Sequence, residues 1–218
     1  LALLAWSGFS QIDQVARASG SVIASRRVQV IQAVDGGVLQ QLDVAEGDRV
    51  KAGQVLARFD PVRPQSEFEA AESKRAALLA SAARLQAELG QREISWPDEV
   101  KRFPEFQRVQ GDLFRGRRDN LHADLASLAA LAKAAREELR ITEQLVRDGD
   151  ASQLELLRAQ RQVAESQSKL DSRRNQFIQD VSTELAKVRD DLEQSEQTAT
   201  QRRRQLQNIV VTAPMDGI

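Results

Sequence analysis

The chain has 218 residues, of which 29% are charged and only 4% are aromatic, and its formal net charge is -1. This composition is too polar and too poor in aromatic residues for one large compact core, and it favours long exposed helices. The balanced charge argues against nucleic-acid binding through net charge, so we expect no nucleic-acid partner. The absence of cysteine excludes disulfides, thiolate catalysis and Cys-ligated metal, and His122 is the only histidine, so a histidine-based metal site would need ligands from another chain.

The first residues, LALLAWSGF, are apolar and do not begin with Met. They are too short to cross a bilayer, which takes about 20 apolar residues. Two interpretations stay open. Residues 1–10 are either a fraying apolar end or the last turns of a truncated transmembrane helix, with Trp6 at the membrane interface. Residues 11–25, which mix Val and Ile with Gly20, favour an extended linker or a strand.

Residues 26–60 consist of short β-like runs separated by glycine turns. Polar and apolar residues alternate from Val28 to Ala33, and further apolar runs span Val38 to Val44 and Val55 to Phe59. We expect about half of a small β-sandwich here. Residues 209–218 again read as a strand followed by a turn, and we expect them to begin the second half, truncated at the end of the chain.

Two outward helices are predicted between these β segments, over about residues 64–94 and 105–147. The first is expected to start with a capping box made by Ser66 and Glu69. The segment from Trp96 to Pro104 separates the two helices, because each of its prolines removes a helical hydrogen bond. The apolar seam of the second helix consists of Phe114, Leu121, Leu125, Leu128, Ala132, Ala135, Leu139 and either Leu145 or Val146.

The return helix is predicted over residues 152–208, a stretch without proline or glycine. Ser152 and Glu155 have the spacing of a capping box, and Gly149 stands where the preceding helix would end, so the tip is expected at 148–151. A helix of this length reaches roughly 85 Å and needs a partner along most of it. Its seam has a period of about 3.5 residues, typical of a coiled coil, and consists of Leu156, Ala159, Val163, Ser166, Leu170, Arg174, Phe177, Val181, Leu185, Val188, Leu192, Ser195, Ala199, Arg202, Leu206 and Ile209.

The predicted fold class is therefore mainly α with a small β part. A long antiparallel α-helical hairpin, of the coiled-coil type and spanning residues 61–208, is inserted between the two halves of a β-sandwich. The sequence of the β halves carries a resemblance. The run GGVLQQLDVAEGDRVKAGQVLARFD looks like the first half of a biotinyl/lipoyl-type domain, and VVTAPMDGI looks like the opening of its second half.

In carrier domains of that type the modified lysine stands at a tight hairpin between the halves, whereas here helices take that place and Lys51 lies in an earlier turn. A lipoyl-like domain interrupted by a helical hairpin resembles the membrane fusion proteins, or periplasmic adaptors, of the haemolysin D type. The resemblance covers nearly the whole chain. The segment from Glu105 to Leu121, with its Gln, Leu-Phe, Arg and Leu, looks like the type I secretion branch.

This resemblance implies an adaptor that links an inner-membrane ABC exporter to a TolC-like outer-membrane channel for type I protein secretion. The implied partners are that exporter, that channel, the secreted protein and further copies of the chain, expected to form a hexamer. The implied location is a single-pass inner-membrane anchor, with the bulk of the chain in the periplasm of a Gram-negative bacterium.

The hairpin tip is the candidate site of contact with the channel. In the family the tip motif is Arg, three residues, Leu, six residues and Ser. Leu145 and Ser152 fit this spacing, whereas Ile141 stands at the arginine position and Arg140 is one residue away. Leu145 could instead belong to the seam, and Ser152 could be only a helix cap. The turn is small and polar, suited to end-to-end docking, and the implied contact residues are Leu145, Arg147, Asp148, Gly149, Asp150 and Ser152.

We expect no enzymatic activity, no catalytic residue, no metal and no cofactor. Acidic pairs such as Asp190-Asp191 lack an apolar enclosure that would raise a carboxyl pKa, and the sequence contains no P-loop, dinucleotide fingerprint or nucleophile elbow. Three alternatives stay open: the adaptor of a multidrug efflux pump, a lipoyl or biotin carrier modified at Lys51, and a cytoplasmic coiled-coil scaffold.

Overall fold

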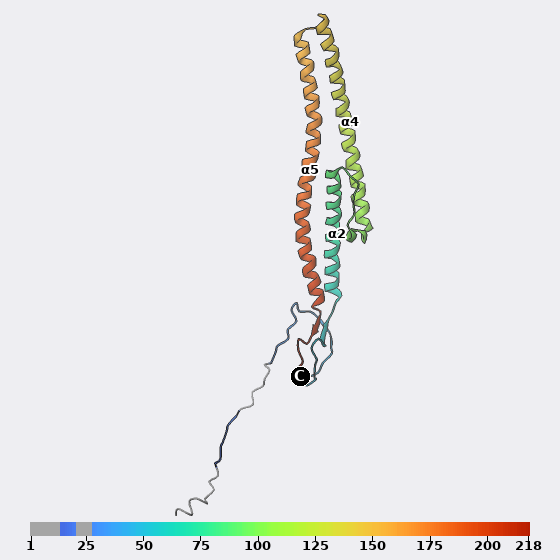
Figure 1. Cartoon of the computed structure of the whole chain (residues 1–218). Coiled ribbons are helices and arrows are strands. Elements are labelled where there is room, and N and C mark those ends of the chain that lie inside the picture. The colour runs from blue at the N-terminus through green and yellow to red at the C-terminus, as the bar shows by residue number, and fades with distance from the viewer. Residues whose placement is uncertain (1–13, 21–27) are drawn as a thin grey trace, which may run out of the picture. The chain divides into compact units, whose positions relative to one another are not determined.

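The computed structural model describes residues 14–20 and 28–218. The chain divides into two units, Leu1–Gln32 and Ala33–Ile218. The described residues of the first unit form no helix or strand and are exposed. The helices and the sheet all lie in the second unit (Figure 1). The transmembrane end expected at residues 1–10 lies outside the described residues. None of the helices in the part that is described is long and apolar enough to cross a bilayer.

A three-stranded antiparallel sheet stands at the base of the second unit, in the order β1-β2-β3. Its strands are β1 (Leu39–Leu42), β2 (Val55–Phe59) and β3 (Val210–Thr212). The alternation over Val28 to Ala33 predicts a further strand, and this prediction is wrong. Among the residues that the structure describes, no strand pairs with this segment, and Val28 is 95% exposed.

The central strand β2 joins two segments that are far apart in the sequence. Its residues pair with β1 on one edge and with β3 on the other, where Val55 is opposite Thr212. Beyond the strands, Gly53 donates its backbone N–H to the carbonyl of Ala213 at 2.7 Å, and Ala52 donates to the Asp216 carboxylate at 2.8 Å. Two glycine-rich segments far apart in the sequence therefore form one β unit, as predicted.

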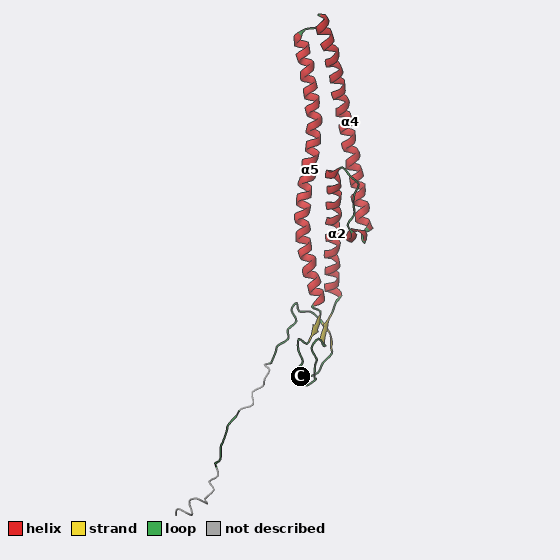
Figure 2. Ribbon diagram, in the orientation of Figure 1, coloured by secondary structure: helices red, strands yellow, loops and turns green. Residues whose placement is uncertain are grey.

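The helices between the two β segments form the hairpin (Figure 2). They are α2 (Val62–Gly90), the short α3 (Asp98–Lys101), α4 (Pro104–Asp148) and α5 (Gln153–Gln207). The return helix α5 lies beside α2 near the sheet and beside α4 as far as the tip (Figure 1). The predicted fold class, a long antiparallel hairpin between two halves of a lipoyl-like β part, is confirmed.

The start of α2 differs from the prediction. The capping box expected from Ser66 and Glu69 is absent because the helix begins at Val62, a turn earlier. Pro61 precedes it, where a missing N–H costs nothing, and the Asp60 carboxylate accepts the N–H of Val62 at 3.0 Å. The helix also ends at Gly90 rather than near residue 94, since Gln91 takes a left-handed conformation with φ 47°.

The packing of α5 confirms the predicted seam. Its buried residues all belong to that seam: Ala159, Ser166, Val181, Leu185, Ser195 and Ala199. Val181 and Leu185 form a core cluster with Ala82 and Leu85 of α2. Arg174 is the only seam position that is exposed, and it lies beyond the end of α2.

Candidate functional site

The turn at the tip is closed by the backbone. Gly149 ends α4 with φ 86°, a left-handed conformation that side chains oppose. Its N–H bonds to the carbonyl of Val146 at 3.2 Å, and the next N–H, of Asp150, bonds to the carbonyl of Leu145 at 2.8 Å. The chain reverses within a few residues, so the two long helices are held side by side at their far ends.

Ser152 then starts α5 as predicted, through a capping box. Its hydroxyl accepts the N–H of Glu155 at 3.3 Å, and the Glu155 carboxylate accepts the N–H of Ser152 at 2.7 Å. The backbone hydrogen bond from Ser152 lowers the pKa of Glu155 below its ordinary value, and the hydroxyl adds to this effect. A charged carboxylate at the first turn also suits the helix dipole.

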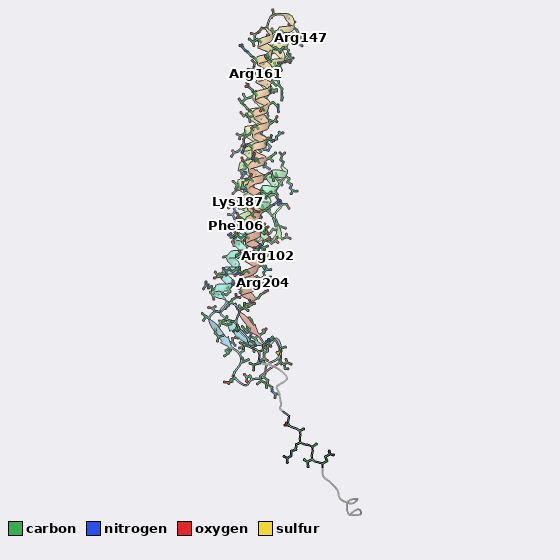
Figure 3. All side chains as sticks on the ribbon, turned by 90° about the vertical axis from the view of Figure 1, so that its left-hand side faces the viewer. Arg102, Phe106, Arg147, Arg161, Lys187 and Arg204 are labelled. Carbon is green, nitrogen blue, oxygen red and sulfur yellow. The ribbon has the colours of Figure 1, made fainter. Side chains whose placement is uncertain are left out.

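All six predicted contact residues are exposed at this turn or beside it. Leu145 is 41% exposed, whereas Val146 is half-buried, so Val146 and not Leu145 belongs to the seam. Arg147 lies at the tip in Figure 3. Whether these residues touch another protein stays a prediction.

The tip is less polar than the sequence of its turn indicates. Besides Leu145, three large apolar side chains near the tip are exposed by 48 to 55%: Ile141, Leu154 and Leu157. We call these four residues the apolar collar. The prediction missed three of its members because they lie off the seam, and their apolar character at positions that should face water was the available signal.

Arg140, one residue from the family's arginine position, is engaged within its own helix. Its guanidinium bonds to Glu137 at 2.7 Å. This hydrogen bond, followed by the attraction between the charges, raises the pKa of Arg140. The hairpin therefore presents Ile141 and Leu145 at places where the motif has Arg and Leu.

A second cluster, the ionic cluster, lies where α2, α4 and α5 pack together. Arg84 is 2% exposed and donates to three acceptors: Glu88 at 2.7 Å, Gln110 at 2.7 Å and Glu184 at 2.6 Å. Arg117 donates to the other oxygen of Glu184 at 2.7 Å. Sequence reasoning missed this cluster, because charges along a long helix are usually solvated.

Burial raises the pKa of Glu184, and the hydrogen bonds from Arg117 and Arg84 lower it by more, so the net shift is downward. The carboxylate therefore stays charged between the two guanidinium groups. The cluster joins all three helices through side chains alone. The cluster therefore holds the three helices together, and one of its members, Glu88, also lines the cavity beyond the end of α2.

Comparison with known families identifies the family to which this fold belongs. The family model described as "RND MFP, barrel-sandwich hybrid domain" matches residues 26–218. The chain belongs to this family of membrane fusion proteins. The membership predicted from the β segments and the inserted hairpin is confirmed.

Several curated relatives are also similar. The type I secretion system membrane fusion protein PrsE of Rhizobium meliloti is 40% identical over 83 residues, which is 38% of this chain and 19% of PrsE. The proteases secretion protein PrtE of Dickeya chrysanthemi is 31% identical over 134 residues, covering 58% of this chain and 30% of PrtE. Protein CyaD of Bordetella pertussis is 26% identical over 237 residues, covering 99% of this chain and 52% of CyaD. The chain thus spans about half the length of these relatives or less.

Two solved structures are similar. The soluble domain of LipC, a membrane fusion protein of a type I secretion system, has a TM-score of 0.49 at 25% identity, with 87% of this chain and 90% of that chain covered. The periplasmic adaptor protein EmrA has a TM-score of 0.43 at 17% identity, with 84% of this chain and 62% of the EmrA chain covered.

Proposed function

We propose that this membrane fusion protein is a periplasmic adaptor of type I protein secretion. It would link an inner-membrane ABC exporter to a TolC-like outer-membrane channel and would have no enzymatic activity of its own. The secreted protein would pass through a tube made by several copies, six in the proposed assembly. A single inner-membrane span would anchor each copy on the side of the exporter.

The observation that carries this proposal is the hairpin that leaves and rejoins one sheet. Both of its ends are fixed at β2, so its tip is held about 80 Å away by the 55 residues of α5. A rod of this kind can transmit a fixed spacing between two membranes. It encloses no path by itself, which is why several copies are needed.

The names of the relatives support the secretion branch over the efflux branch. PrsE is named as a type I secretion system membrane fusion protein and PrtE as a proteases secretion protein. The exposed tip supports docking at its end. On docking, the apolar collar would bury apolar surface, and the exposed residues Arg147, Asp148 and Asp150 would make polar contacts around it.

Crosslinking from the tip tests the proposal. The full-length protein, which has no other cysteine in this segment, would carry Asp150→Cys with a photoreactive label in cells that make the channel and the exporter. We expect an adduct with the outer-membrane channel. Asp190→Cys, on the half of α5 nearer the sheet and exposed, is the matched control and should give no such adduct. An adduct that forms equally from both positions, or from neither, would contradict the proposal.

A further inference from the structure

A groove opens in the hairpin where α2 ends. Figure 1 shows that α2 reaches only part of the way along α5, while α4 continues beside α5 to the tip. Directly after the end of α2 lies a cavity of about 590 Å³. Six apolar side chains form its floor, which we call the groove floor: Leu89, Phe114, Leu121, Leu125, Phe177 and Ile178.

The groove continues the track of α2. On the side of the sheet, the seam residues Val181 and Leu185 of α5 are covered by Ala82 and Leu85 of α2. One turn beyond Val181, Phe177 is only half-buried, and Ile178 beside it is 44% exposed. The groove therefore has the form of a place for a third helix on two packed helices, as α2 itself occupies nearer the sheet.

The rim of the groove is basic. Arg92, Arg118 and Arg174 surround it, together with His122. Arg92 and Arg174 are exposed, and neither forms an ion pair with a residue in the described part of the chain. Arg174 occupies a seam position at which a fully packed coiled coil would place an apolar residue.

The acidic groups nearby do not neutralise this rim. Glu93 is the exposed acid in the lining of the cavity, and it bonds to Arg118 at 3.0 Å, which also lies 3.9 Å from the exposed Asp119. Glu88 is buried and its carboxylate is bound by Arg84 at 2.7 Å within the ionic cluster. The guanidinium group of Arg118 also lies over the Phe114 ring, 5.3 Å from its centre, so it covers part of the groove floor. Two unpaired cations thus flank an apolar floor.

We propose that this groove binds an acidic amphipathic helix of another protein. The apolar stripe of that helix would cover the groove floor, and its Asp or Glu residues would pair with Arg92 and Arg174. The position of the groove, on the continuation of α2 between α4 and α5 (Figure 1), selects a helix, because an amphipathic helix buries its stripe in a groove between two others. The charge of the rim selects an acidic one, since opposite charges at the edge of an interface fix its partner and register. This site is separate from the tip and does not depend on the channel contact.

Fluorescence anisotropy with two synthetic peptides tests this proposal. Both peptides carry Leu at helical i, i+3, i+4 and i+7 spacing, and one has Glu and the other Lys on the flanks. We expect the Glu peptide to bind the chain and the Lys peptide to fail. In the double variant Arg92→Glu with Arg174→Glu, the affinity for the Glu peptide should fall by about tenfold or more, and binding of the Lys peptide should appear. Both substituted residues are exposed, so the variant should keep its helical circular dichroism spectrum.

Arg161→Glu is the matched control. Arg161 is an exposed arginine of the same helix, nearer the tip and outside the groove (Figure 3), and its substitution should leave both affinities unchanged. Equal binding of the Glu peptide to the parent and to the double variant would overturn the proposal, as would the absence of binding. Self-association of the parent chain that the double variant abolishes would assign the groove to a second copy and would also overturn it.

Discussion

Arg84 on α2 donates to Glu184 on α5 at 2.6 Å, although the two residues are 100 positions apart in the chain. Arg84 and Glu88 are both buried, with side chains 3% and 2% exposed. Removing one member of such a pair leaves the other charge buried without compensation, which costs far more than the pair contributes.

We therefore predict that Arg84→Met destabilises the hairpin by about 3 kcal/mol, the usual cost of breaking a buried pair. The measurement is the free energy of unfolding in urea, followed by circular dichroism. Arg63→Met is the matched control, because Arg63 bonds to Glu67 with a side chain that is 90% exposed, and it should leave the midpoint almost unchanged. Equal midpoints for the two variants would show that the ionic cluster does not hold the helices together.

The ionic cluster also predicts a dependence on pH. The pKa of Glu184 is lowered in the folded chain from its ordinary 4.5, because the hydrogen bonds from Arg117 and Arg84 outweigh the opposing effect of burial. The resulting stabilisation is present above pH 4.5 and is lost as the pH falls through the lowered pKa. Glu184→Gln should be less stable than the parent at neutral pH, and this difference should shrink in acid. A difference that stays constant between pH 7 and pH 3 would refute this role.

Two glycines in α4 and at its end should respond oppositely to the same substitution. Gly149→Ala should destabilise the tip by about 1 kcal/mol, since its φ is 86° and alanine resists this conformation. Gly116→Ala should stabilise the chain by about 0.5–1 kcal/mol, because Gly116 is helical and an added Cβ meets no atom within 4 Å. Thermal unfolding of both variants checks the signs, and two shifts in the same direction would contradict this account of the turn.

The capping box offers a local test. Ser152→Ala should cost about 1 kcal/mol, whereas Ser152→Asp should preserve most of the cap, because a carboxylate can accept the N–H of Glu155 in place of the hydroxyl. Amide hydrogen exchange in the first turn of α5 is the measurement, with faster exchange expected in the alanine variant alone. Similar exchange in both variants would mean that the cap does not fix the start of the helix.

Much of the hairpin could be predicted because its information is local. The spacing of apolar residues along α5 predicts its buried face, and Ser152, Glu155 and Gly149 predict the turn. The start of α2 was mispredicted because Asp60 and the prolines after it outweighed a weaker serine signal. The ionic cluster and the groove could not be predicted, since both depend on which residues of three separate helices lie at the same height.

The account depends most on the closure of one sheet by the segments on either side of the hairpin. Val50 and Gly217 form an antiparallel pair with reciprocal backbone hydrogen bonds of 3.0 Å, and such pairs bring their Cα atoms to about 5.5 Å, within reach of a disulfide. The chain has no cysteine of its own, so Val50→Cys with Gly217→Cys should form an internal disulfide under mild oxidation, visible as faster migration on a non-reducing gel. Val50→Cys with Asp150→Cys, which places one thiol at the tip, should form none. Failure of the first pair to close, or equal closure of both pairs, would contradict the return of the hairpin to its own base.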